Sequence, residues 1–238
     1  MKPIVILQHE PDDPPGLVAT VLDELKVPFE VRRLDLDPSL PAYPDECAGL
    51  IVMGGSMHVH QVRQYPFLDA EKAYLRSLLK QCAPIWGICL GAQLLAMAAG
   101  GDVHERKTAE IGWTTIEKKL DDPLLHGVGS PFVAFEWHLY SCKLPPFGQT
   151  IAESEHDDGL QAFRAGGRAW GIQFHPEVDA GMIENWIAEE EKDLEAHAPG
   201  LVERLRAETP QRLADNEVLC RHLTTNFLLT SGLLPADK

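Results

Sequence analysis

The chain has 238 residues, a formal net charge of −15 and an apolar fraction of 45%, which is typical of a globular protein with a sizeable buried core. Its acidity argues against binding to nucleic acid or to an anionic membrane, because both partners need a basic protein face. No apolar run approaches the roughly 20 residues of a membrane-spanning helix. The five cysteines are scattered and include no C-x-x-C pair, so we expect no disulfide framework, no zinc site and a cytoplasmic location.

The first half of the chain alternates continuous apolar runs with segments of helical spacing. The apolar runs are typical of strands buried on both faces, and strands that alternate with helices imply a parallel sheet with right-handed crossovers. Such a sheet binds ligands at the carboxyl ends of its strands. We expect strands at 4–7, 29–34, 49–53 and 84–88, and helices at 17–25, 67–82 and 92–99.

The second half contains short strand candidates separated by turns, which predicts antiparallel strands that return to the main sheet. We expect strands at 112–116, 131–135, 150–152, 160–164 and 169–174, and helices at 180–196 and 218–229. The predicted fold class is α/β, with a mostly parallel central sheet flanked by helices and with added antiparallel strands in the second half. Because the chain has no repeats and no linker, we expect a single domain over 1–238, with a core over about 1–190 and a C-terminal helical extension over about 191–238.

A cysteine occupies the apex of one predicted strand-to-helix turn. Gly87 and Gly91 flank Cys89 two residues away on either side, as a sharp turn requires where a side chain would strike the neighbouring backbone. The free N–H groups and the dipole of the following helix favour a thiolate and can stabilise an oxyanion. By itself Cys89 would be interpreted as a buried core thiol, but with these neighbours we interpret it as a nucleophile.

A nucleophilic thiolate needs a proton acceptor, and the acceptor needs an orienting partner. Among the ten histidines, His175 stands out because it ends an apolar run and begins the sequence His175-Pro176-Glu177. Pro176 turns the chain, and Glu177 can fold back to accept a hydrogen bond from the imidazole, which fixes the tautomer. The alternative interpretation is a strand end with a solvated ion pair, but the presence of Cys89 favours catalysis.

Three segments together resemble the class I, triad-type glutamine amidotransferases. They occur in the family's order and at about its spacing, as Met-Gly-Gly-Ser at 53–56, Gly-Ile-Cys-Leu-Gly-Ala-Gln at 87–93 and Gln-Phe-His-Pro-Glu at 173–177. The resemblance covers roughly residues 1–190 and is closest to stand-alone domains similar to the glutaminase part of guanosine monophosphate synthetase. It implies a flavodoxin-like class I amidotransferase fold, no cofactor, and a triad in which Cys89 is the nucleophile, His175 the general base and then acid, and Glu177 the orienting carboxylate.

The resemblance also implies roles for residues around the triad. The N–H groups of Gly55 and Leu90 would form the oxyanion hole, and Gln93, one helical turn beyond the cysteine, would contact the substrate. His138 fits the family pattern for a further substrate contact. The family usually continues with a Gly-containing turn after this histidine, whereas this chain has Leu139, which adopts glycine's backbone angles less easily. This difference predicts an altered pocket for the glutamyl end of the substrate.

The implied activity is hydrolysis of a γ-glutamyl amide bond through a cysteine thioester, with glutamine as the substrate and a separate synthetase as the possible acceptor of ammonia. The altered turn after His138 leaves a second activity open, the hydrolysis of γ-glutamyl peptides or conjugates. A catalytically silent regulatory or binding subunit is an alternative of another class, although such a subunit would have no need of an intact triad. A cysteine peptidase of the same architecture is a further alternative, against which Gln93 argues mildly.

Two other sequence features allow functional interpretations that we regard as weak. His58 and His60 alternate along the chain and could ligate a metal from one face of a strand, but no third ligand is nearby, so we expect no metal site. The acidic run at 189–191 predicts a solvated helix face.

Overall fold

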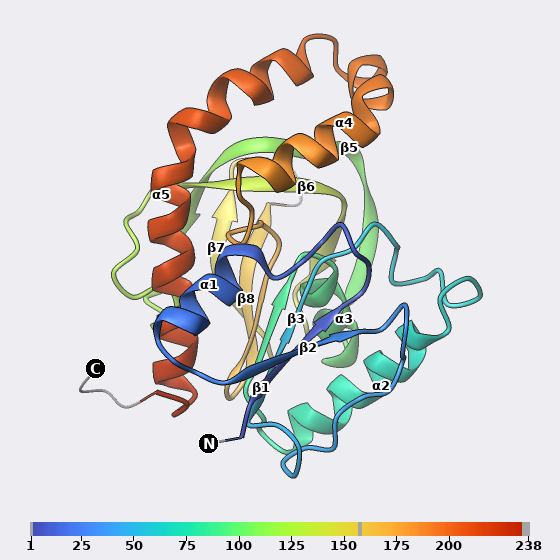
Figure 1. The fold of residues 1–238 in the computed structure, drawn as a ribbon, viewed down its shortest axis with the longest axis vertical. Helices are drawn as coiled ribbons and strands as arrows, with labels where there is room; N and C mark the ends of the chain where they lie inside the picture. The colour runs from blue at the N-terminus through green and yellow to red at the C-terminus, as the bar shows by residue number, and fades with distance from the viewer. Residues whose placement is uncertain (1, 157–158, 235–238) are drawn as a thin grey trace.

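A mixed sheet forms the centre of the protein, which a computed structural model describes over residues 2–156 and 159–234 (Figure 1). Its parallel strands are β1 (Ile4–Gln8), β2 (Phe29–Arg33), β3 (Gly49–Val52), β4 (Ile85–Ile88) and β9 (Ala169–Ile172). Its antiparallel strands are β5 (Asp102–Lys118), β6 (Phe132–Lys143), β7 (Gln149–Ser154) and β8 (Leu160–Gly166). The helices are α1 (Gly16–Glu24), α2 (Phe67–Lys80), α3 (Leu90–Ala98), the 3₁₀ turn η1 (Pro123–Leu125), α4 (Ala180–His197) and α5 (Leu201–Thr230).

The described strands lie in the order β2-β1-β3-β4-β9-β8-β7-β5-β6. Strand β9 therefore joins the two halves of the sheet, because it pairs in parallel with β4 and antiparallel with β8. The predicted α/β class, with a parallel first half and an antiparallel second half, is confirmed. No helix in the described part of the chain combines the length and the apolar character that crossing a bilayer requires.

Successive residues of the central strands enter two different cores, as the two-residue period of a strand requires. In β1, Ile4 and Ile6 face a core that also contains residues of α1 and of the C-terminal half of α5. Val5 and Leu7 face a second core that contains residues of α2 and α3. The continuous apolar run of β1 therefore reflects a strand that is covered by helices on both faces.

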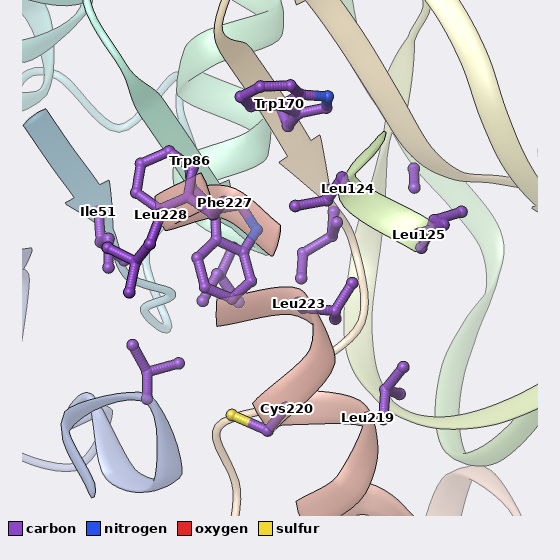
Figure 2. Packing of buried hydrophobic residues seen from close by; sticks show 14 of the residues in the cluster. Ile51, Trp86, Leu124, Leu125, Trp170, Leu219, Cys220, Leu223, Phe227 and Leu228 are labelled. Atoms are coloured by element: carbon purple, nitrogen blue, oxygen red, sulfur yellow. The ribbon is translucent and has the colours of Figure 1, made fainter. Parts of the chain in front are cut away.

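Helix α5 packs against the two strands whose ends carry the predicted catalytic residues. The ring of Phe227 lies 5.8 Å from that of Trp86 on β4 and 6.2 Å from that of Trp170 on β9, measured between centroids (Figure 2). All three side chains are fully buried. A buried aromatic side chain removes about 150–250 Å² from water, so this cluster contributes several kcal/mol to the free energy of unfolding.

A third core lies between α4, the first half of α5 and strand β6. It contains Phe135 of β6, Trp186 of α4 and Leu205 of α5. This core fixes α4 beside β6, and Figure 1 shows α4 and the first half of α5 together at the top of the view, next to β5 and β6. Because Trp186 also contacts the ring of His175, the core positions one wall of the candidate site.

The antiparallel ribbon of β5 and β6 is longer than the sequence pattern predicts. Strand β5 begins at Asp102 rather than at 112, and its first half has no apolar alternation because it pairs at the edge of the sheet with β6. The pairing is irregular between Glu105 and Glu110. Strand β6 continues to Lys143, so Leu139 lies in an extended strand and not in a turn.

The last helix also begins earlier than predicted, at Leu201 rather than at 218. Pro210 lies inside this helix and removes one backbone hydrogen bond, at a cost of about 3 kcal/mol. Burial of Leu201, Val202 and Leu205 against α4 offsets this cost, and α5 curves over the molecule in Figure 1. Residues 235–238 of the expected C-terminal extension lie outside the described residues, and the expectation of a single domain stays a prediction.

Candidate active site

Cys89 lies at the apex of a strained turn between β4 and α3. Its φ of 48° and ψ of −107° are unusual for a residue with a side chain. A Cβ on Gly87 would lie 2.5 Å from the carbonyl group of Gly91, and a Cβ on Gly91 would collide with the carbonyl oxygen of Val52. The backbone N–H of Cys89 donates to the carbonyl oxygen of Ile172 at 2.8 Å. The two glycines and this hydrogen bond hold the thiol above the ends of the central strands.

His175 and Glu177 form a buried pair just beyond strand β9. Nδ1 of His175 lies 2.7 Å from Oε1 of Glu177, and the two residues are 2% and 0% exposed. The backbone N–H of His175 donates to the carbonyl oxygen of Phe135, and the imidazole packs edge to face with the indole of Trp186, with 5.1 Å between ring centroids. These contacts fix both the position of the ring and its tilt.

Cys89 and His175 both line one cavity of about 570 Å³. Strands β4 and β9 are parallel neighbours, so the residues that follow them emerge at the same edge of the sheet. Burial lowers the pKa of His175, but the charges of Glu177 and of a Cys89 thiolate, with hydrogen bonds to both, raise the pKa well above its usual value. The site therefore favours a protonated His175 beside the sulfur of Cys89.

The two predicted oxyanion-hole residues both line this cavity with Cys89. Gly55 follows β3 and Leu90 begins α3, so their backbones approach the thiol from two different elements. Among residues 2–156 and 159–234, no hydrogen-bond acceptor is found for the N–H group of either residue. Both donors are therefore available for an oxygen that carries developing negative charge.

The predicted substrate contacts, Gln93 and His138, also line the cavity. The side-chain amide of Gln93 donates to the carbonyl oxygen of Tyr140 at 3.1 Å, and Nδ1 of His138 bonds to the same oxygen at 3.0 Å. Nε2 of His138 lies 3.0 Å from Glu136 and 3.4 Å from Glu110. Burial lowers the pKa of His138, but its bonds to the two carboxylates raise the pKa to about 9. His138 therefore places a positive charge in the wall of the cavity.

Sequence reasoning missed two polar residues beside the triad. Gln173 donates a hydrogen bond to Sγ of Cys89 at 3.6 Å; it lies inside the motif at 173–177, but the motif alone gave no role for it. Asp13 is 4% exposed, and Oδ1 has no hydrogen-bond partner in the described part of the chain. Burial and the nearby Glu177 charge raise the pKa of Asp13 to about 7. Its position in the loop after the first predicted strand was the available signal.

Two clusters of three side chains have a geometry that could hold a metal ion. One is Asp13 with His175 and Glu177, and the other is Glu110 with Glu136 and His138. In each cluster, the histidine already pairs with a carboxylate at 3.0 Å or less. A protonated imidazole that attracts the carboxylates is therefore enough to explain why the three side chains lie together in each cluster.

His58 and His60, which were weighed as alternate residues on a strand, lie outside the strands. The ring of His60 bonds to the carbonyl oxygen of Val103, whereas the ring of His58 packs against Tyr140. All five cysteines are free, and Cys82 alone among them is exposed.

A family model described as class I glutamine amidotransferase matches residues 16–191. The chain belongs to the class I glutamine amidotransferase family. The predicted family is thereby confirmed. The match includes Gly55, Cys89 and His175, and it ends within α4.

Relatives of this amidotransferase include proteins of different length. The glutamine-hydrolysing GMP synthase of Aeropyrum pernix is 32% identical over 178 residues, which are 72% of this chain and 33% of that protein. The chain thus spans about a third of the length of this relative. A single subunit of the glutamine-hydrolysing GMP synthase of Ignicoccus hospitalis is 33% identical over 154 residues, which are 62% of this chain and 79% of that subunit.

The fold of this amidotransferase is shared along nearly its whole length by a solved structure. The glutamine amidotransferase from Methylobacillus flagellatus superposes with a TM-score of 0.86 at 29% identity, covering 97% of this chain and 95% of that one. The similarity therefore includes the helical region after residue 191, which the family model does not match.

Proposed function

We propose that this class I glutamine amidotransferase hydrolyses the side-chain amide of glutamine through a γ-glutamyl thioester on Cys89. The observation that supports this most directly is the convergence on one cavity of Cys89, the His175–Glu177 pair and the free N–H groups of Gly55 and Leu90. These are the groups that acyl transfer to sulfur needs: a nucleophile, an oriented base and two donors for an oxyanion.

Acylation begins when the Cys89 thiolate attacks the γ-carbonyl carbon and forms a C–S bond. The carbonyl oxygen becomes an oxyanion, which the N–H groups of Gly55 and Leu90 stabilise by about 3 kcal/mol each. As the tetrahedral intermediate collapses, the C–N bond breaks and His175 gives its proton to the leaving nitrogen. Ammonia departs, and the glutamyl group remains on sulfur as a thioester.

Deacylation repeats this sequence with water as the nucleophile. Neutral His175 takes a proton from the water as its oxygen attacks the thioester carbon, and the same two N–H groups stabilise the second oxyanion. The C–S bond then breaks, so glutamate is released and the thiolate is restored beside an imidazolium. Glu177 keeps the proton on Nδ1 of His175 throughout, so that Nε2 faces the reaction.

Intact-mass spectrometry after mixing with glutamine tests this proposal. We expect a glutamyl adduct on Cys89 when the wild type is quenched with acid during turnover, and no adduct in Cys89→Ala or in His175→Ala, whose leaving nitrogen lacks its proton donor. Ammonia release by the wild type should accompany the adduct. A wild type that releases ammonia from glutamine while Cys89→Ala does so equally well would overturn the proposed route.

We also propose that any acceptor of the ammonia is a separate protein. The A. pernix GMP synthase is about three times as long as the segment that matches this chain, whereas the I. hospitalis relative is itself one subunit of a GMP synthase.

A second candidate activity is the hydrolysis of γ-glutamyl conjugates, and the charge of the cavity favours it. The cavity reaches from Cys89 to α4, where Glu189, Glu190 and Asp193 line it. No Lys or Arg is among the described residues of its wall. The exposed acidic face expected at 189–191 therefore borders the site, and a substituent of positive charge on the amide nitrogen would be attracted to it.

A matched pair of substrates separates this activity from simple glutamine hydrolysis. A γ-glutamyl amide whose amine part carries an ammonium group should have a higher kcat/KM than one whose amine part carries a carboxylate. The difference should shrink in Glu189→Gln/Asp193→Asn and at high salt, because it is electrostatic. Glutamine turnover far above that of either conjugate would eliminate this second activity.

A further inference from the structure

A buried ion pair behind the cavity holds one side of the oxyanion hole. Nε2 of His9 lies 3.0 Å from Oε2 of Glu71, and Nδ1 of His9 lies 2.7 Å from the carbonyl oxygen of Gly54. Both side chains are 0% exposed. His9 directly follows β1, Glu71 belongs to α2 and Gly54 follows β3, so three elements meet at this contact.

Nδ1 of His9 must carry a proton, because a carbonyl oxygen only accepts hydrogen bonds. Burial lowers the pKa of His9, but the charge of Glu71 and the hydrogen bonds to Glu71 and Gly54 raise the pKa above its usual value. An imidazolium donates from both nitrogens and satisfies both partners at once. The ring also stacks on Phe67 of α2, with 6.1 Å between ring centroids, which restricts its rotation.

The bond from His9 decides which way the next N–H points. The C=O of Gly54 and the N–H of Gly55 belong to one planar trans peptide and therefore point in opposite directions. His9 does not line the cavity, whereas Gly55 does. With its carbonyl held on the buried side by His9, this peptide presents the N–H of Gly55 to the cavity, where that group has no acceptor in the described part of the chain.

The opposite orientation of this peptide would disable the site. It would place the carbonyl oxygen of Gly54 in the cavity, where it would repel an oxyanion, and it would turn the N–H of Gly55 toward the donors of His9. The surroundings of Gly55 are also tight, since an added Cβ would meet Met57 at 2.6 Å and Leu90 at 3.0 Å. Two glycines in succession would leave the peptide between them free to rotate. The hydrogen bond from His9 to the carbonyl oxygen of Gly54 removes that freedom.

We propose that the His9–Glu71 pair is a positioning device that locks the Gly54–Gly55 peptide in its active orientation, so that the chain is competent to form the thioester without a partner protein. This inference rests on the proposed function, because the N–H of Gly55 matters only if Cys89 attacks a carbonyl group. It assigns His9 and Glu71 a role in the transition state although neither touches the substrate.

Two variants of His9 separate this role from a structural one. The amide nitrogen of Asn takes about the place of Nδ1 of His, and that of Gln takes about the place of Nε2. His9→Asn therefore keeps the donor to Gly54, and His9→Gln keeps the donor to Glu71. If the ion pair only stabilised the fold, His9→Gln would be the milder change, whereas the lock predicts that His9→Asn is milder.

We expect kcat for glutamine to fall by about 10²–10³-fold in His9→Gln, as for the loss of one oxyanion donor, and by tenfold or less in His9→Asn. KM should change little in both, because the lost interaction forms only in the transition state. The rate of Cys89 alkylation by iodoacetamide, which passes through no oxyanion, should stay within a few-fold of the wild type. The affinity for the γ-aldehyde of glutamate, which adds to the thiolate as an oxyanion, should fall in parallel with kcat.

If either variant fails to fold, the same comparison is made in a Glu71→Gln background, which leaves no buried carboxylate without its cation. Equal losses in the two variants, or a greater loss in His9→Asn, would overturn the lock while leaving the proposed function intact. A wild type that forms the thioester only when a second protein is added would also overturn it. A wild type that forms no thioester on Cys89 under any condition would instead remove the proposed function itself.

Discussion

The side-chain amide of Gln173 lies 3.6 Å from Sγ of Cys89 and donates a hydrogen bond to it, while its oxygen is 3.8 Å from Sγ of Cys142. The sulfur of Cys89 therefore has a fixed donor on the side of strand β9, in addition to the imidazole of His175. Gln173 is 2% exposed, so no solvent replaces this donor when it is removed. The thiolate gains a charge-assisted bond that a thiol would use only weakly.

Gln173→Leu should lower the rate of Cys89 alkylation by iodoacetamide about tenfold at pH 7, because a hydrogen bond to a charged group contributes about 1.5–3 kcal/mol and sulfur is a weak acceptor. The measurement is the second-order alkylation rate followed by mass spectrometry. Cys142→Ala removes the other neighbour of Gln173 and serves as the control, with a rate within about threefold of the wild type. An alkylation rate in Gln173→Leu equal to that of the wild type would mean that the amide does not stabilise the thiolate.

Glu177→Gln should reduce kcat for glutamine by roughly 10²–10⁴-fold, in line with the loss of an orienting carboxylate in other triads. The amide of Gln would present a donor to Nδ1 and shift the imidazole to the wrong tautomer. It would also lower the pKa of His175, because Glu177 supplies the largest of the contributions that raise it. On the alkaline side of the pH profile, kcat/KM should therefore begin to fall at a lower pH than in the wild type. An unchanged profile would contradict the role assigned to Glu177.

The ion pairs of His138 with Glu136 and Glu110 should make the free energy of unfolding depend on pH. The pKa of His138 is about 9 in the folded protein against 6.5 for a free histidine, so the folded state holds the proton more tightly. The resulting stability is fully present below pH 6.5 and is lost as the pH rises from 6.5 to 9, with a loss of about 3 kcal/mol. Urea unfolding at about pH 6 and about pH 9 measures it.

The double variant His138→Gln/Glu136→Gln is the control for this pH effect, because it removes His138 together with Glu136, while Glu110 keeps its ion pair with Arg106 at 3.3 Å. Other groups with raised pKa values, such as His175, titrate in the same direction in both proteins, so the difference between wild type and variant reports on the pair. We expect the variant to lose less stability than the wild type over the same rise in pH. Identical losses in the two proteins would show that the pair does not contribute.

Gly91→Ala should abolish activity and destabilise the protein, because a Cβ at this position collides with the carbonyl oxygen of Val52. Relief of the clash requires α3 to move away from β3, which carries Cys89 with it. Gly129→Ala is a matched control, since the nearest atom to an added Cβ there is 3.7 Å away. Thermal unfolding and ammonia release measure both variants, and a Gly91→Ala protein of normal activity would refute the strained turn.

Phe227→Ala should lower the unfolding free energy by about 3–5 kcal/mol, the usual cost of removing a fully buried aromatic ring. The cavity would open between Trp86 and Trp170, directly beneath the strands that carry Cys89 and His175. Val218→Ala, on the same helix but 56% exposed, should change stability by no more than about 0.5 kcal/mol. Denaturant unfolding measures the free energy of unfolding of both variants. Equal values would mean that the packing of α5 on the sheet does not stabilise the fold.

The sequence allowed the parallel half of the sheet and the closeness of Cys89, His175 and Glu177 to be predicted, because their signals are local. The apolar run of β1 and the glycines around Cys89 each encode one element by themselves. His175 could be paired with Cys89 because parallel strands deliver their ends to one edge. The family resemblance then supplied Gly55 and Leu90. Their proposed roles depend on backbone N–H groups, which the identity of a side chain does not reveal.

Other parts of the site could not be predicted, because they depend on contacts between distant segments. The burial of Asp13 follows from the closeness of the loop after β1 to Gly54, and a lone Asp in a polar loop gives no sign of it. The contact of His9 with Glu71 joins residues on different elements. The early start of α5 at Leu201 depends on packing against α4, which outweighs the local effect of Pro210.

The position of β9 in the sheet has a consequence for biosynthesis. This strand leaves the ribosome after β1 to β8, yet it occupies a place between β4 and β8 rather than at an edge. A nascent chain that ends before Ala169 carries the thiol of Cys89 but lacks His175 and Glu177. If His175 is the base that Cys89 requires, as proposed above, the chain gains its activity only when β9 takes its place between β4 and β8.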